Sequence, residues 1–532
     1  MHHITIKRQG QTMSTDPTVT PSQNQQSTDY VSHTRTPHRS HSSEKDAVSH
    51  YTPAHTDQTE PQSGGLIQKG EGLQVVIGLG QSGLATANYL ARRGYKVAVT
   101  DGNSAPKLAE QLEPNISIRA FGDIDAELLL QASRIIISPG VSLATPAVAA
   151  AKQAGIAIVS DIQLFKEACK APIVAITGSN AKSTVTTLVG QMAKDAGVNV
   201  GVGGNIGVPA LSLLEDEALG EAMQLAVLEL SSFQLETVTN LGAKVATVLN
   251  MSPDHLDRHG DMLGYHQAKH RIFQGAQSVV VNRDDALSRP LIADNTPRLS
   301  VGSGAPDLGE YGLITEGDGR IYLAKGTEKL LAADQLKVKG KHNLVNALAA
   351  LALGGLAGLP KQSMLKTLQE FSGLPHRCQF VDNVAGVDYF NDSKGTNVGS
   401  TLAAILGLGS VYGNQSGAKT KLMLILGGQG KGQQFGELVP LINKYVSQIL
   451  LIGQDAELIE SHLQQANLSG DVETHQCHDL AQAMTKANSL LSSSLSQVTT
   501  VLLSPACASL DQYPSYAKRG EHFCELVGKL KD

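Results

Sequence analysis

The sequence lacks the features that mark several large classes of protein. It holds five cysteines, an odd number with no CxxC spacing, so neither a disulfide framework nor a zinc site is expected. The cysteines are Cys169, Cys378, Cys477, Cys507 and Cys524. The formal net charge is -6, so no overall basic field exists to attract nucleic acid. These absences favour a reducing cytoplasm and exclude a broad nucleic-acid surface.

Long apolar runs are also missing. The longest uncharged run, residues 347–360, is interrupted by Gly354, Gly355 and Gly358. It is shorter than the roughly 18 residues that a bilayer span requires, so it predicts a buried helix. The N-terminus has no apolar segment followed by a cleavage site, so neither a secretory signal nor membrane insertion is expected.

The chain is long enough for several domains. Its 532 residues exceed what one hydrophobic core organises, and the usual domain size predicts three domains plus a tail. Residues 1–68 are rich in Ser, Thr, Gln, Pro and His with almost no apolar periodicity, which predicts a disordered tail. The histidines of this tail have no regular ligand spacing, so compositional bias is favoured over a metal site.

From Leu73 onward, short β-rich runs alternate with helical segments, and this alternation predicts parallel sheets. The first domain, 69–165, has strands in LQVVIGLG, YKVAVTD, RIIISPG and AIVSD. The second, 166–372, has them in PIVAIT, LAVLELSS, KVATVLN and QSVVVN. The third, 373–532, has them in VDYF, TKLMLILGG, QILLIGQ and TVLLSPA. The expected fold class is α/β, with three mostly parallel, doubly wound domains after the tail.

Two loops have the composition of phosphate cradles. Residues 78–83, GLGQSG, follow an apolar strand, open a helix and precede a second strand that ends at Asp101, which is a nucleotide-binding fingerprint. Alone, this motif favours an NAD enzyme; tight strand–helix packing without a ligand is the alternative. The second loop, residues 178–184, reads GSNAKST and places Lys182 and Ser183 at a helix start, where they suit phosphates and Mg²⁺.

The second loop departs from the strict P-loop pattern. Ile176 and Ala181 stand where that pattern has glycines, so a neutral turn before a helix is the alternative. If Ala181 has a positive φ, its conformation costs on the order of 1 kcal/mol.

Polar side chains follow several further strands. Glu229 ends the strand in LAVLE, where a carboxylate beside a P-loop is the ordinary partner of Mg²⁺, and polar residues 250–259 follow the next strand. Lys269 by pattern alone is an exposed helical lysine. Arg377, at the domain boundary, either reaches across a closing cleft to a phosphoryl group or forms an ordinary ion pair.

Loops 391–397, 427–431 and 504–512 follow strands of the third domain and should share one edge of its sheet. The first of these could hold a zwitterionic substrate.

The motifs TGSNAKST, ELSSFQLE, DHLDRH, AKHRIF, KHNLVNA, GLPHR, NDSKGTN, GGQGKG and SPACASLDQ together resemble the Mur ligase family in order and spacing. The match covers nearly everything after about residue 70. GLGQSG, GVGGNIG, ELSSFQLE and SPACASLDQ resemble the members that add D-glutamate. The resemblance implies an ATP-dependent ligase that joins D-glutamate to UDP-N-acetylmuramoyl-L-alanine through an acyl phosphate. It replaces NAD with a UDP-sugar at the GLGQSG loop.

The resemblance also implies roles for individual residues. The UDP-sugar would contact Gly80, Gln81, Ser82, Asp101, Ser138, Gly140, Asn205 and His255. ATP would contact Gly178, Ser179, Asn180, Ala181, Lys182, Ser183, Thr184, Asn343, Asn346, Arg377, Asp392 and Lys394. D-glutamate would contact Lys394, Thr396, Lys431, Ser509, Leu510 and Tyr516. Two Mg²⁺ ions would use Ser183, Glu229, His255 and Lys269, the lysine as a carbamate. The catalytic residues would be Lys182, His255, Lys269 and Arg377.

The implied partners are therefore small molecules, with no nucleic acid, and the chain is expected to act as a monomer. One departure from the family lies in the first domain: Gly102 and Asn103 follow Asp101 where a hydroxyl and an arginine are common.

Overall fold

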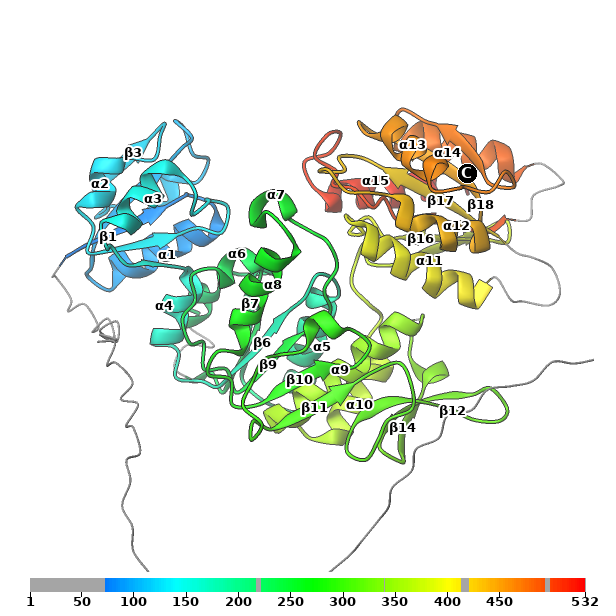
Figure 1. Ribbon diagram of the computed structural model, residues 1–532, viewed down its shortest axis with the longest axis horizontal. Coiled ribbons are helices and arrows are strands. Elements are labelled where there is room, and N and C mark those ends of the chain that lie inside the picture. The colour runs from blue at the N-terminus through cyan, green and yellow to red at the C-terminus, as the bar shows by residue number, and fades with distance from the viewer. Residues whose placement is uncertain (1–71, 217–221, 339, 413–420, 493–497, 532) are drawn as a thin grey trace, which may run out of the picture. The chain divides into compact units, whose positions relative to one another are not determined.

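A computed structural model describes residues 72–216, 222–338, 340–412, 421–492 and 498–531 of the chain (Figure 1). The strands form three mostly parallel sheets, each accompanied by helices, so the predicted α/β fold class is confirmed. The predicted tail, residues 1–68, lies outside the described residues. Within the described ranges, no helix combines the length and the apolar character needed to cross a membrane.

The first sheet has five parallel strands in the order β3-β2-β1-β4-β5. The strands are β1 (Leu73–Ile77), β2 (Lys96–Asp101), β3 (Ile118–Phe121), β4 (Arg134–Ile137) and β5 (Ile158–Val159). The helices are α1 (Gln81–Arg92), α2 (Ala126–Leu130), α3 (Pro146–Gln153) and α4 (Asp161–Ala168). The apolar residues of β1 are buried on both faces, as expected for a central parallel strand covered by helices.

The second sheet has nine strands in the order β14-β13-β12-β11-β10-β9-β6-β8-β7. Its parallel part contains β6 (Ile173–Thr177), β7 (Val200–Gly204), β8 (Leu225–Glu229), β9 (Val245–Val248), β10 (Val279–Asn282) and β11 (Arg298–Val301). Strands β12 (Tyr311–Thr315), β13 (Ile321–Lys325) and β14 (Glu328–Ala332) extend it, with antiparallel pairing between β12, β13 and β14. The helices are α5 (Lys182–Asp195), α6 (Ser232–Leu235), α7 (Leu256–His259), α8 (Met262–His270), α9 (Lys341–Ala357) and α10 (Lys361–Glu370). Helix α9 contains most of the uncharged run and is largely buried, which confirms the predicted buried helix.

The third sheet has six strands in the order β15-β16-β20-β17-β18-β19. The strands are β15 (Gln379–Val384), β16 (Val387–Asn391), β17 (Lys421–Gly427), β18 (Val446–Ile452), β19 (Glu473–Gln476) and β20 (Val498–Leu503). The helices are α11 (Val398–Tyr412), α12 (Val439–Tyr445), α13 (Ala456–Gln465), α14 (Leu480–Leu491) and α15 (Tyr516–Gly528). Only β15 runs antiparallel to its neighbour. The boundaries predicted near residues 165 and 372 stay predictions, although both fall between strands of different sheets.

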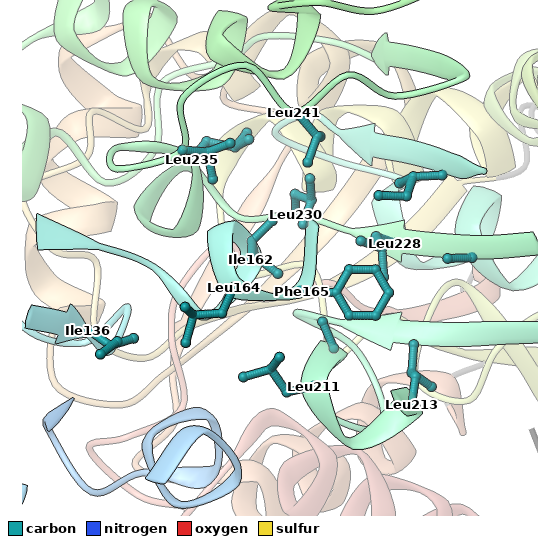
Figure 2. Packing of buried hydrophobic residues seen from close by; sticks show 14 of the residues in the cluster. Ile136, Ile162, Leu164, Phe165, Leu211, Leu213, Leu228, Leu230, Leu235 and Leu241 are labelled. Carbon is teal, nitrogen blue, oxygen red and sulfur yellow. The ribbon is translucent and has the colours of Figure 1, made fainter. Parts of the chain in front are cut away.

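One hydrophobic cluster includes residues of both the first and the second sheet (Figure 2). Helix α4 contributes Ile162, Leu164 and Phe165, which lie between Ile136 of β4 and Leu228 of β8. Fully burying an aliphatic or aromatic side chain of this size contributes roughly 2 kcal/mol relative to exposure. This shared core therefore couples the two sheets, whereas the third sheet is covered by clusters built from its own segments.

Candidate active site

A cavity of about 950 Å³ is lined by loops from the second and third sheets. Most of the predicted ATP, metal and D-glutamate residues line it. They are Ser179, Asn180, Ala181, Lys182, Ser183, Thr184, Glu229, His255, Lys269, Asn343, Asn346, Arg377, Asp392, Lys394, Thr396, Lys431, Ser509, Leu510 and Tyr516, together with Asn205. These loops follow the carboxyl ends of parallel strands, which is the usual position of ligand sites in α/β sheets.

The P-loop lies at the start of α5 and is held by neighbouring strands. Ala181 has φ 65°, so it adopts the left-handed conformation whose cost the sequence analysis considered for this position. The side chain of Asn250, which follows β9, accepts a hydrogen bond from the Asn180 N–H (2.8 Å) and donates one to the Asn180 carbonyl (3.2 Å). The Lys182 Nζ donates to the carbonyls of Gly178 and Ser179, both at 2.9 Å. Burial lowers the pKa of Lys182, partly offset by the nearby Glu229 and Asp254 carboxylates.

Glu229, at the end of β8, is 2% exposed. One carboxylate oxygen accepts a hydrogen bond from Asn205 Nδ2 (2.8 Å), and the other has no hydrogen-bond partner among the described residues. A buried carboxylate oxygen without a partner costs free energy, unless a cation or donor binds it. Because the Ser183 hydroxyl lines the same cavity, the pair supplies the hard oxygen ligands that Mg²⁺ prefers.

Lys269, on α8, is 2% exposed, so the expectation of an exposed helical lysine is wrong. Its helix turns this residue toward the P-loop, where Nζ donates to the Gly178 carbonyl at 2.9 Å. Burial, with a smaller contribution from the Lys182 charge, lowers the pKa of Lys269 well below its usual value. This shift favours the neutral, nucleophilic form of the amine more than in an exposed lysine.

His255 stands directly before α7 with φ 54°, and its Nε2 lies 3.6 Å from a carboxylate oxygen of Asp254. Burial is the main cause that lowers the pKa of His255, against the opposing effect of Asp254. The neutral imidazole therefore dominates at neutral pH, with a ring nitrogen able to accept a proton or a metal ion. Among the residues with described positions, no three His, Cys, Asp or Glu side chains gather as a metal site by themselves.

Arg377 connects the third sheet's segment to the P-loop. Its guanidinium donates to the Ser183 hydroxyl at 2.6 Å, so its hydrogen-bond partner is a P-loop side chain. Burial lowers the pKa of Arg377, while the charge of Glu229 opposes that shift. Arg377 thus contacts the P-loop, and its predicted reach to a transferring phosphoryl group stays a prediction.

The third-sheet loops form a buried polar cluster. The two carboxylate oxygens of Asp392 accept hydrogen bonds from the Ser504 hydroxyl (2.7 Å) and the Cys378 N–H (3.1 Å). Burial raises the pKa of Asp392 to about 7. The Lys394 ammonium lies 4.4 Å from the centre of the Tyr516 ring, and burial lowers the pKa of Lys394 to about 8.

The predicted first-sheet residues do not line this cavity. Gly80, Gln81 and Ser82 instead follow β1, Asp101 ends β2, and Ser138 and Gly140 follow β4. An Asp101 carboxylate oxygen accepts a hydrogen bond from the Leu79 N–H (2.5 Å), and the Ser138 hydroxyl donates to the Gly78 carbonyl (2.7 Å). The predicted residues thus gather in two places, one at each cradle loop.

Comparison with known proteins identifies the chain's relatives. Three family models match it: "Mur ligase MurD-like, N-terminal domain" over residues 73–160, "Mur ligase middle domain" over 176–354 and "Mur ligase, glutamate ligase domain" over 376–507. The UDP-N-acetylmuramoylalanine–D-glutamate ligase of Psychrobacter cryohalolentis is 68% identical over 465 residues, covering 87% of this chain and 97% of that protein. The chain belongs to the Mur ligase family.

Further relatives agree with this membership. The protein with the same name from Acinetobacter baylyi is 52% identical over 465 residues, covering 87% of this chain and 100% of the relative. Among solved structures, UDP-N-acetylmuramate–alanine ligase MurC of Thermotoga maritima matches with a TM-score of 0.52 at 18% identity, covering 86% of this chain and 99% of that one. MurF of Acinetobacter baumannii also gives 0.52 at 18% identity, covering 83% and 86%. These two likenesses support the fold.

Mur ligases are ATP-dependent enzymes that form amide bonds, so the predicted enzyme class is confirmed and an NAD dehydrogenase loses its support. Sequence reasoning missed a large buried residue on a helix of this Mur ligase's third domain. Arg519 of α15 is 1% exposed, and its guanidinium donates to the carbonyls of Ser393 (2.9 Å) and Cys507 (3.0 Å), which joins two polar loops. Because Arg519 lies inside a helix and does not follow an apolar strand, the sequence pattern gave no sign that it is buried between the loops.

A smaller cavity of about 200 Å³ lies beside α9. It is lined by the polar residues Thr247, Asn250, Asn282, His342 and Asn346 and by the apolar residues Leu249, Val301, Val345 and Ala349. His342 and Asn346 also line the larger cavity. Within the described part of the chain, His342 Nδ1 has no hydrogen-bond partner, so this Mur ligase offers an unpaired polar atom inside a recess lined by both polar and apolar residues.

Proposed function

We propose that this chain uses ATP to join D-glutamate to UDP-N-acetylmuramoyl-L-alanine. The relatives with 52% and 68% identity carry the name of that ligase, and the chain covers nearly their whole length. The single observation that carries the proposal in the structure is the contact of Arg377 with Ser183 inside the large cavity. It brings an arginine beside the phosphate loop and next to the polar loops suited to an amino acid.

ATP would lie along the P-loop. The backbone N–H groups at the start of α5 and the Lys182 ammonium suit the β- and γ-phosphates, because a helix N-terminus favours negative charge. Lys182, which donates to two loop carbonyls, can turn to the phosphates. The base would enter the 200 Å³ cavity, where Asn346 and the orphan nitrogen of His342 offer polar partners.

Mg²⁺ fits the residues beside the P-loop. The orphan oxygen of Glu229 and the Ser183 hydroxyl would hold one ion, which would shield phosphate charge when bound. His255 and Lys269 would serve a second. Burial favours the neutral form of the Lys269 amine, which is the form that captures CO₂, and the resulting carbamate is an anion that suits a cation.

The reaction would proceed in two steps. An oxygen of the L-alanyl carboxylate attacks the γ-phosphorus, the bond to ADP breaks, and an acyl phosphate forms. The neutral amine of D-glutamate then attacks the carbonyl carbon, phosphate leaves with the electrons of the C–O bond, and the amine releases one proton. Lys182 and Arg377 would stabilise the charge on the transferring phosphoryl group.

The two substrates would occupy opposite sides of this centre. D-glutamate would contact Lys394, Thr396, Lys431, Ser509, Leu510 and Tyr516 of the third-sheet loops. The UDP group would lie on the first sheet at Gly80, Gln81, Ser82, Asp101, Ser138 and Gly140, with Asn205 and His255 toward the sugar. Because every substrate is a small soluble metabolite, we place the enzyme in the cytoplasm. We also expect it to act as a monomer.

The test is phosphate release with ATP, Mg²⁺ and UDP-N-acetylmuramoyl-L-alanine. Release should require D-glutamate and should stay at background with L-alanine, L-glutamate or meso-diaminopimelate. Release with another of these amino acids in place of D-glutamate would overturn the substrate assignment, and the absence of release with all four would overturn the ligase itself.

A further inference from the structure

The segment that carries Arg377 has an unusual backbone. His376 has φ 62° and Cys378 has φ 45°, so both neighbours of Arg377 adopt the left-handed conformation, which non-glycine residues rarely accept. The direction of the guanidinium toward Ser183 therefore depends on a backbone that must be held from outside.

Groups that follow this segment in sequence hold both residues. The His376 N–H donates to Gln379 Oε1 (2.9 Å), and the His376 carbonyl accepts from the Lys394 N–H (3.0 Å). The Cys378 N–H donates to Asp392 (3.1 Å). The bonds to Lys394 and Asp392 fix the backbone on either side of Arg377 to the loop that follows β16, and the bond to Gln379 fixes His376 to the start of β15.

Asn391, the last residue of β16, holds the imidazole of His376 as well. Asn391 is fully buried, directly after the apolar Tyr389 and Phe390. Its Nδ2 lies 3.0 Å from His376 Nδ1, 3.0 Å from the Gly520 carbonyl and 3.2 Å from Cys524 Sγ. A buried amide at such a position is costly unless its polar atoms are paired.

Two backbone groups fix the orientation of this amide. The Ser393 N–H can only donate, so it selects Asn391 Oδ1 as acceptor (3.1 Å), and the Gly520 carbonyl can only accept, so it selects Nδ2. The second N–H of Nδ2 faces both His376 Nδ1 and Cys524 Sγ, and the imidazole nitrogen is the nearer and stronger acceptor, so His376 Nδ1 accepts this hydrogen bond. His376 is then neutral, with its proton on Nε2.

We propose that Asn391 is a positioning residue for the reaction: it holds His376, and through the His376–Cys378 segment it directs Arg377 at the transferring phosphoryl group. This inference rests on the proposed function of Arg377. The Asn391 amide joins the end of β16 to α15 and the segment before β15, so one buried side chain fixes three segments around the arginine.

Gly520 offers a second way to displace the same imidazole. A Cβ on Gly520 would lie 2.3 Å from His376 Nδ1, so Gly520→Ala must displace the ring. Because Gly520 lies inside α15, where alanine is otherwise the better helix former, the collision with His376 is the main expected effect of this substitution.

The test is a double-mutant cycle between positions 391 and 377, measured as ADP formation with UDP-N-acetylmuramoyl-L-alanine and D-glutamate. Arg377→Lys should lower kcat roughly 100-fold in the wild-type background but less than about 10-fold in Asn391→Leu, because the arginine is already misdirected there. KM for ATP and for the UDP-sugar should change little. Effects that multiply independently would overturn the positioning role.

Two further variants complete the design. Asn443→Leu is the matched control, because the Asn443 side chain also bonds two backbone groups of the third-sheet region, Ser469 N–H (2.9 Å) and Asn467 O (3.2 Å), away from the cavity. It should leave kcat unchanged. If Asn391→Leu fails to fold, Gly520→Ala takes its place in the cycle, and independent effects there would overturn the inference. A wild-type enzyme without ADP formation would instead refute the proposed function.

Discussion

The loop after β1 and the loop after β6 share one construction and differ in what surrounds them. Each follows a buried parallel strand and opens a helix, α1 or α5. At the first loop, Asp101 uses a carboxylate oxygen to hold the loop backbone. At the second, Lys182, Lys269, Glu229 and Arg377 converge from α5, α8, β8 and the segment before β15. The backbone thus supplies a cradle in both places, but only the second has the charges for phosphoryl transfer.

The strongest test of this difference between the two loops is to remove the P-loop cation, Lys182. Lys182→Ala should abolish ADP formation, with a fall of at least roughly 1,000-fold in kcat, because the phosphates lose their nearest positive charge. Binding of the UDP-sugar, measured by titration calorimetry, should remain nearly intact, since the first loop has none of this machinery. Unchanged turnover would remove Lys182 from the mechanism.

The first loop should be sensitive to changes in its packing and not to the loss of a charge. A Cβ on Gly83 would lie 1.8 Å from the Gly78 carbonyl oxygen, so Gly83→Ala must move the backbone of the cradle. We expect a loss of about 3 kcal/mol in unfolding free energy, measured by denaturant titration, together with weaker UDP-sugar binding. Gly80→Ala is the matched control for stability, because a Cβ there meets no atom within 4 Å. Equal destabilisation by both variants would contradict this account.

A buried carboxyl group lies between the two regions. Asp161 begins α4, is 2% exposed, and accepts a hydrogen bond from Gln234 of α6 (3.5 Å). Burial raises the pKa of Asp161 from 3.8 to about 6, against the opposing effects of hydrogen bonds, including one with Ser82 of the first loop. The folded state therefore binds this proton more tightly than the unfolded state does.

This shift predicts the sign of a pH effect. The contribution of Asp161 to stability should be present below pH 3.8 and should be lost as pH rises through about 6. Asp161→Asn should remove that slope, so the variant should be more stable than wild type at pH 7.5 by up to about 3 kcal/mol. Unfolding titrations of both proteins at pH 4.5 and 7.5 measure the difference. Parallel pH profiles would show that Asp161 keeps its ordinary pKa.

The sequence predicted the strands that are buried on both faces and missed several at the margins of the sheets. Strands β1, β6 and β17 are rich in apolar residues and agree with the predicted strands. Strands β15 and β19 lie at sheet edges and were missed, because β15 mixes polar and apolar residues and β19 has no apolar residue. An edge strand is defined by the neighbour it pairs with, and local composition carries little of that information.

The same distinction applies to the site. Residues at the end of an apolar strand or directly after it, such as Glu229 and Asp392, line the cavity, and their roles there stay predictions. Lys269 was expected at the surface by its pattern, because nothing in its own helix indicates that α8 packs against the P-loop. Arg519 was missed for a related reason: its partners, the carbonyls of Ser393 and Cys507, are brought to it by the third sheet.

The smallest expected effect concerns backbone strain. The P-loop places an alanine in a left-handed conformation, whereas the first loop has a glycine in one. Gly78 occupies a left-handed position with φ 86°, whereas Ala181 occupies one with φ 65° despite its Cβ. Ala181→Gly should relieve roughly 1–2 kcal/mol of strain and lose part of this gain to the larger entropy of the unfolded chain. The net expected gain in unfolding free energy is about 0.5–1 kcal/mol by denaturant titration. Ala193→Gly, inside the same helix, should instead destabilise by about 1 kcal/mol, so a matching loss at both positions would mean that Ala181 is not strained.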